Sequence, residues 1–117
     1  MTDRELLELA AKAAGIVGLW HERGQCIHVT NCAGMSDVWW RPLEDDGDAL
    51  RLAVKLNIGI RSHGADHWHN PSSSVALYEV GDHGGRVTVE HGDDPSFSTR
   101  RAIVRAAAAI GKAHHDR

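Results

Sequence analysis

The spacing of apolar residues predicts a helix at the start of the chain. Thr2–Glu5 forms a capping box, in which the threonine hydroxyl can accept a hydrogen bond from the Glu5 amide. Leucines and alanines then recur at helical intervals as far as Ala14, and Gly15 supplies a typical helix end. We therefore expect the first helix over residues 3–14. The apolar run 16–19 either lengthens this helix or begins the next element.

Two further helices are predicted from their caps and apolar faces. Acidic residues at 45–48 place a capping oxygen and negative charge before a wide apolar face that ends at Asn57. Asp94 and Pro95 provide a cap and a first-turn proline for a last helix over residues 95–113.

Between the helices, short alternating runs predict strands. Residues 26–29 and 38–41 are short extended runs, and residues 58–61 alternate as they enter a polar loop. Residues 74–80 and 86–90 alternate on either side of a glycine-rich turn, which predicts a β-hairpin. The order is therefore α-β-β-α-β-β-β-α. It indicates a single α+β domain over residues 1–117, with a mostly antiparallel sheet and helices packed on one face.

Composition narrows the class of protein but not its function. The chain has 117 residues and a formal charge of −3 with neutral histidines, which argues against general nucleic-acid binding. Two cysteines with five residues between them match neither a redox nor a zinc pattern, so we expect free thiols. The start of the chain does not resemble a signal peptide, and no apolar run is long enough to cross a membrane. We expect a cytoplasmic protein with no membrane contact.

The segment from Ser62 to Asn70 holds the densest group of reactive side chains. His67 and His69 are two residues apart, and His63 or Asp66 could complete a set of three metal ligands. This spacing matches no established zinc pattern, so we predict neither a metal nor a cofactor. The histidines could also act as acids or bases, but no known nucleophile or phosphate-loop motif accompanies them. We predict no catalytic residue, and whether the protein is an enzyme stays open, with binding favoured.

Tryptophan and arginine suggest a ligand-binding pocket. Indole rings can stack on a base, and guanidinium groups can hold a phosphate. Alternation places Trp39 and Trp40 on opposite faces of a strand, so one of them should be buried and the other exposed. The ligand-binding residues that we predict are Trp39, Trp40, Arg41, Arg61, His63, His67, Trp68, His69, Arg101 and Arg105.

The last helix has two features that bear on partners. Arg101 and Arg105 are four residues apart, and they form either a phosphate-facing stripe or an ordinary solvated face. The alanines at 106–109 could let a partner helix approach closely, which suggests a homo-oligomer.

Three segments together resemble known short proteins: residues 2–16 (TDRELLELAAKAAGI), 40–56 (WRPLEDDGDALRLAVKL) and 98–112 (STRRAIVRAAAAIGK). They are similar to uncharacterised proteins of proteobacterial temperate phages and prophages, and more distantly to the NinX-like phage proteins. The resemblance implies a small phage accessory protein inside a bacterial cell. It carries no catalytic residue and does not include the histidine-rich loop.

These observations lead to three hypotheses. In the first, the protein is a non-enzymatic counter-defence protein that sequesters a nucleotide-derived immune signal, such as a cyclic ADP-ribose or a cyclic dinucleotide. In the second, it is a histidine-based phosphodiesterase that cleaves such a molecule. In the third, it inhibits a host defence or regulatory protein, which predicts an exposed apolar patch and no convergent pocket.

Overall fold

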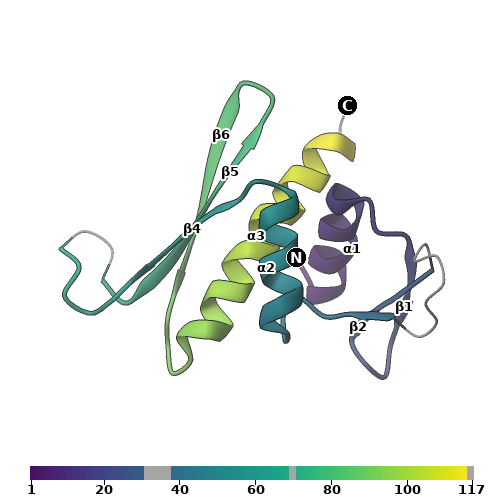
Figure 1. Ribbon diagram of the computed structural model, residues 1–117, viewed down its shortest axis with the longest axis horizontal. Coiled ribbons are helices and arrows are strands. Elements are labelled where there is room, and N and C mark those ends of the chain that lie inside the picture. Colours follow the sequence, from purple (N-terminus) through teal and green to yellow (C-terminus); the bar gives the residue numbers. More distant parts are fainter. Residues whose placement is uncertain (31–37, 69–70, 116–117) are drawn as a thin grey trace.

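The computed structural model describes residues 1–30, 38–68 and 71–115. The described residues form helices and strands in the order α1-β1-β2-β3-α2-β4-β5-β6-α3 (Figure 1). The helices are α1 (Asp3–Ala14), α2 (Asp46–Lys55) and α3 (Pro95–His115). The strands are β1 (Gly18–His21), β2 (Cys26–Val29), β3 (Val38–Trp40), β4 (Gly59–His63), β5 (Ser73–Val80) and β6 (His83–Glu90).

The helix ends follow the local chemistry that the sequence predicts. The Thr2 hydroxyl accepts from the Glu5 amide at 3.2 Å, and Gly15 closes α1 in the left-handed conformation with a φ of 71°. Asp45 caps α2 by accepting from the amide of Asp48 at 2.8 Å. Asp94 accepts from two amides in the first turn of α3. The predicted starts of all three helices are confirmed within one residue.

The strands form two antiparallel sheets, and the predicted α+β class is confirmed. Sheet A has the order β1-β2-β3 and sheet B the order β4-β5-β6. The sequence predicted one strand fewer, because it left residues 16–19 undecided and did not show a sheet division. Gly18 explains the extra strand: a Cβ atom there would overlap the backbone carbonyl of His28 on β2, so only glycine allows this pairing.

Each sheet packs its inner face on a helix. In sheet A, Ile27 and Val29 are buried on the side of α1, and Trp40, opposite Ile27 in the register, is only 7% exposed. Trp39 is 38% exposed on the other face, which confirms that one of the paired tryptophans is buried and the other is not. In sheet B, Ala76 is fully buried beneath α3.

Helix α3 lies at the centre of the molecule and packs against α1, α2 and sheet B (Figure 1). Its side chains at 102–104 and 106–108 are all buried. The alanines 106–108 therefore pack within this chain, and they do not form the exposed contact with a partner helix that their size suggested. No described helix is long and apolar enough to cross a membrane.

Gly111 sets how closely α3 and α1 approach. A Cβ atom at this position would overlap the backbone carbonyl oxygen of Leu9 on α1. Because that obstacle is backbone, the clash can be relieved only if one helix moves.

We expect Gly111→Ala to lower the free energy of unfolding by about 1–3 kcal/mol, the usual cost of overpacking a tight contact. Urea denaturation followed by circular dichroism measures this change. Gly64→Ala is the matched control, because a Cβ atom there meets nothing within 4 Å. Equal stability of the two variants would contradict the close approach of the helices.

Candidate functional site

The predicted ligand-binding residues do not gather at one place in the molecule. Trp39, Trp40 and Arg41 belong to the sheet A side, whereas Arg61, His63, His67 and Trp68 belong to sheet B and the loop after β4. The two sheets lie on opposite sides of the helices (Figure 1). His69 lies outside the described residues.

The sheet A part is an aromatic cluster beside acidic residues. The Trp39 ring contacts the rings of His21 and His28, with centroids 4.8 and 4.7 Å apart. A hollow of about 530 Å³ beside it is lined by Trp39, Arg41, Glu44, Asp45 and Asp48. Three carboxylates against the guanidinium of Arg41 disfavour a phosphate there. The buried Trp40 is part of the core and cannot stack on a ligand.

The arginines of α3 belong to the surface of the helix. Arg101 forms an ion pair with Asp3 at 3.0 Å, and Arg105 is exposed. This arrangement agrees with the solvated-face interpretation. Arg100, which was not among the predicted site residues, instead reaches the backbone oxygen of Leu43 and the carboxylate of Asp46.

The outer face of sheet B brings together part of the predicted set and adds one residue to it. In the register, Arg61 lies beside Val75, and Leu77 lies beside Arg86. The face thus carries two exposed arginines on either side of Val75 and Leu77, of which Val75 is buried and Leu77 is 40% exposed. The register places on this face Arg61, His63, Ser73, Val75, Leu77, Glu79, Arg86, Thr88 and Glu90, of which Ser73 and Val75 are buried.

Arg86 could not be found from sequence reasoning, because it enters the group only through the pairing of β5 with β6. Within the described part of the chain, neither Arg61 nor Arg86 forms an ion pair, although Glu79 and Glu90 lie at the margins of the same face.

Stacked rings lie at the end of this face. The rings of His63 and His67 stack with centroids 3.9 Å apart, and the Trp68 ring lies 6.3 Å from that of His67 at an interplanar angle of 20°. Trp68 is 87% exposed. Nδ1 of His63 is buried and has no hydrogen-bond partner among the described residues. These rings offer flat surfaces and nitrogen atoms to a ligand.

The pKa of His63 lies below its ordinary value of 6.5. Loss of water around the imidazole is the main cause, and the positive charges of His67, Arg61, His91 and Arg86 add to it. His63 is therefore neutral at pH 7, although it lies among cationic groups.

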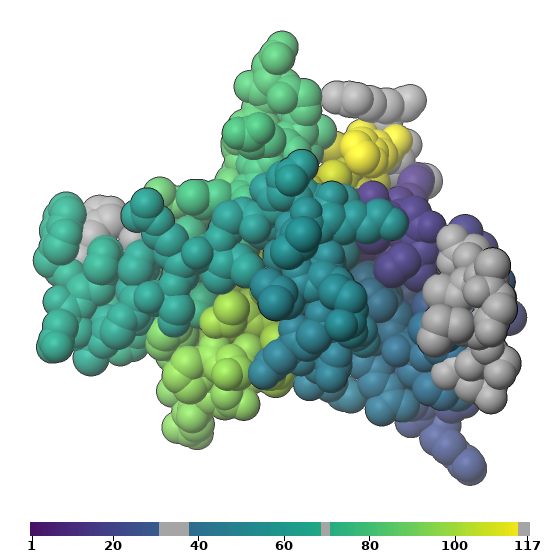
Figure 2. All heavy atoms as spheres, in the orientation of Figure 1, coloured from purple at the N-terminus to yellow at the C-terminus, as the bar shows by residue number. Residues whose placement is uncertain are grey.

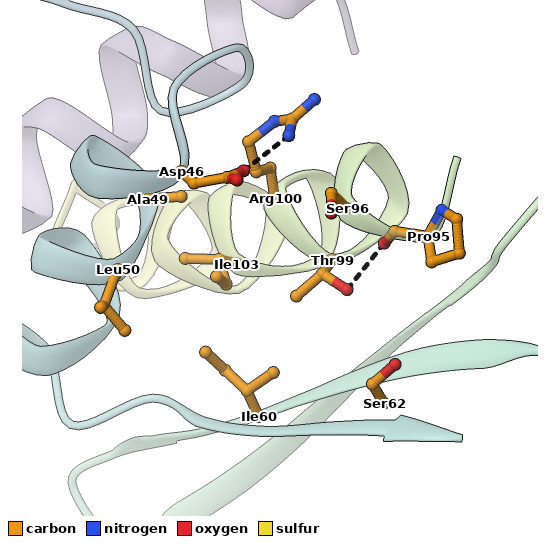
Figure 3. Close-up of a pocket in the computed structure, with 10 residues that line it drawn as sticks. All are labelled: Asp46, Ala49, Leu50, Ile60, Ser62, Pro95, Ser96, Thr99, Arg100 and Ile103. Carbon is orange, nitrogen blue, oxygen red and sulfur yellow. Dashed lines mark hydrogen bonds and ion pairs between the residues drawn. The ribbon is translucent and has the colours of Figure 1, made fainter. Parts of the chain in front are cut away.

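A separate groove lies on the inner side of β4, between α2 and the first half of α3 (Figure 3). It encloses about 310 Å³, and the side chains of Leu50, Ile60 and Ile103 point into it. Leu50 is 59% exposed and Ile60 is 36% exposed. The ion pair of Asp46 with Arg100, at 2.6 Å, borders the groove. The remaining lining residues are Ala49, Ser62, Pro95, Ser96 and Thr99.

Beside this groove, a chain of hydrogen bonds fixes the tautomer of His91. The Thr99 hydroxyl donates to the backbone oxygen of Pro95 at 2.8 Å, so it must accept from the Ser74 hydroxyl, 2.6 Å away. Ser74 then accepts from Nε2 of His91 at 2.9 Å. Nε2 of His91 is therefore protonated, and it cannot take a proton from Ser62, whose hydroxyl lies 3.4 Å away. The group joins strands to α3 and is not a serine nucleophile with its base.

The chain matches no known family model, no curated protein and no solved structure. Among the described residues, no three histidine, cysteine or acidic side chains gather closely enough to hold a metal ion. Cys26 is buried with a free thiol, and Cys32 lies outside the described residues. Function is therefore inferred from the geometry of sheet B.

We expect Ser74→Ala to destabilise the protein by about 1–3 kcal/mol, because Nε2–H of His91 would lose its buried acceptor. Ser62→Ala is the matched control, because Ser62 is exposed, and its effect should stay within about 0.5 kcal/mol. Thermal unfolding compares the two variants, and long-range ¹⁵N NMR of the imidazole reports the tautomer. A spectrum showing Nε2 unprotonated at pH 8 would contradict the proposed direction of the chain.

Proposed function

We propose that the outer face of sheet B, together with the following loop, binds a phosphate-bearing ligand that carries a planar ring, as nucleotides do. The supporting observation is the position of Arg61 and Arg86, which no described carboxylate pairs, on the same face as the stacked His63 and His67. An anion bound there would pair with guanidinium groups that form no ion pair among the described residues, and its contacts with arginine would be charge-assisted.

The parts of such a ligand have distinct places on this face. Its phosphate lies between Arg61 and Arg86, which are diagonal neighbours across β5. Its ring stacks on the exposed indole of Trp68. Leu77, which is 40% exposed beside Arg86, can contact a sugar, whereas Val75 is buried. The end of β4 projects from the body of the molecule (Figure 2).

The proposed activity is binding without chemistry. Because Nε2 of His91 is protonated, it cannot act as a base for Ser62 or Ser74, and the stacked histidines lie in the binding face itself. Under the resemblance to phage proteins, the ligand would be a nucleotide-derived immune signal of the bacterial host, and the protein would sequester it. The geometry of sheet B supports the ligand chemistry, and the biological setting follows from the resemblance alone.

We expect ADP-ribose or a cyclic dinucleotide to bind in calorimetry, and Arg61→Gln or Arg86→Gln to weaken that binding by about fivefold to tenfold. Arg105→Gln, an exposed arginine of α3, is the matched control and should leave affinity unchanged. Ligand released on heating should be chemically intact. Recovery of a cleaved product would instead support a phosphodiesterase. If the protein bound neither ADP-ribose nor a cyclic dinucleotide, the proposal would be overturned.

Binding should also tighten as the pH falls. In the free protein the pKa of His63 is below 6.5, and a bound phosphate raises it by offsetting Arg61, His67, His91 and Arg86. The complex therefore takes up a proton, so affinity rises as the pH falls through the pKa of His63 in the complex and levels off once His63 is protonated in both states.

The carboxylate of Glu90 lies on the neighbouring part of this face. Its negative charge favours protonation of His63, opposite to the effect of these cations, but it is the same with and without bound ligand. His63→Gln should flatten the pH dependence of the dissociation constant, whereas His83→Gln at the hairpin turn should leave it unchanged. A dissociation constant that does not vary between about pH 5.5 and 7.5 would contradict a role for His63 in phosphate binding.

A further inference from the structure

Strand β4 is an open edge of sheet B. It pairs with β5 on one side, and no backbone hydrogen bond joins its other side to another described segment. Four of its five residues are exposed. Unpaired edge strands readily accept another strand, and proteins usually protect them with proline, bulges or charge. In β4 the charged side chain that could protect the edge is Arg61.

The apolar groove lies where the inner side chains of an added strand would pack. Figure 3 shows Leu50 of α2 and Ile60 of β4 on opposite sides of it, with Ile103 of α3 behind them. Leu50 is 59% exposed, and Val54, one helical turn further along α2, is 69% exposed. An apolar side chain opposite Ile60 would therefore enter a hollow that already has three apolar walls.

The two faces of β4 require different residues in the added strand. Side chains opposite Ile60 point toward the groove, whereas side chains opposite Arg61 lie on the outer face, beside a guanidinium without a described partner. Opposite charges directly across a strand pair are stabilising, and like charges are destabilising. An acidic residue therefore fits opposite Arg61, and an apolar residue fits at the neighbouring position.

The same charge argues against a second copy of this chain as the occupant. Arg61 is the central residue of β4, so antiparallel pairing of two β4 strands about a two-fold axis places two guanidinium groups next to each other. Repulsion between them opposes such a dimer.

We propose that the edge of β4 and the adjoining groove bind an extended segment of a partner protein in which apolar and acidic residues alternate. The segment adds a fourth strand to sheet B. Its backbone pairs with β4, its apolar side chains fill the groove between α2 and α3, and its acidic side chains lie beside Arg61. The site is independent of the ligand proposed for the outer face, apart from their shared use of Arg61.

The test uses the full chain and two fluorescein-labelled peptides of about seven residues, one alternating valine with aspartate and one alternating valine with lysine. We expect saturable binding of the aspartate peptide below about 1 mM in fluorescence polarisation, and weaker binding of the lysine peptide. Arg61→Glu should reverse this preference. Hydrogen exchange should slow in the amides of β4 when the aspartate peptide binds, and not in those of β1.

Three variants distinguish the peptide site at the edge of β4 from the nucleotide site on the outer face. Leu50→Ser should weaken peptide binding about tenfold while leaving nucleotide binding unchanged, because it removes an apolar wall of the groove. Leu19→Ser is the matched control, since Leu19 is 69% exposed on sheet A. Trp68→Ala should weaken nucleotide binding and leave peptide binding unchanged.

Three results would overturn the proposal. The first is the absence of saturable binding of the aspartate peptide. The second is equal binding of both peptides with no effect of Arg61→Glu. The third is a concentration-dependent dimer that Leu50→Ser dissociates, which would make a second copy of the chain the occupant.

Discussion

The close contact of α3 with α1 is the constraint on which the rest of the structure depends. Gly111 lies against the backbone of Leu9, and small side chains along α3 let it contact elements on several sides at once. Sheet A packs on α1, and sheet B packs on α3, so this helix pair is what joins the two sheets. The groove also depends on α3, because α2 and β4 both pack against it.

The helices could be predicted from the sequence because their signals are local. Thr2, Gly15, Asp45 and Asp94 each act within a few residues of the helix end that they define. The hairpin of β5 and β6 was equally accessible, because its turn lies between two alternating runs. Strand β1 was not, since residues 16–19 show no clear period and the role of Gly18 depends on the carbonyl of a neighbouring strand. The division into two sheets is likewise a matter of tertiary packing.

The candidate site was only partly accessible to the same reasoning. Arg61, His63, His67 and Trp68 are close in sequence and remain close in space, so their grouping was visible in advance. Arg86 joins them through strand register, and Trp39 with Arg41 is separated from them by the helices. The groove combines α2, β4 and α3, and it could not be predicted because no residue type or spacing along the chain marks it.

The meander order of both sheets has a consequence for folding. Every strand pairs only with a neighbour in sequence, so each sheet can form by closing short loops, which is fast and entropically modest. The slow step is then the docking of α3 on α1, whose contacts join residues about 100 positions apart. Before α3 packs on sheet B, Ala76 and its apolar neighbours on the inner face are uncovered next to the open edge of β4. Aggregation should therefore compete with folding chiefly at this stage, through the same strand that the folded protein presents to its surroundings.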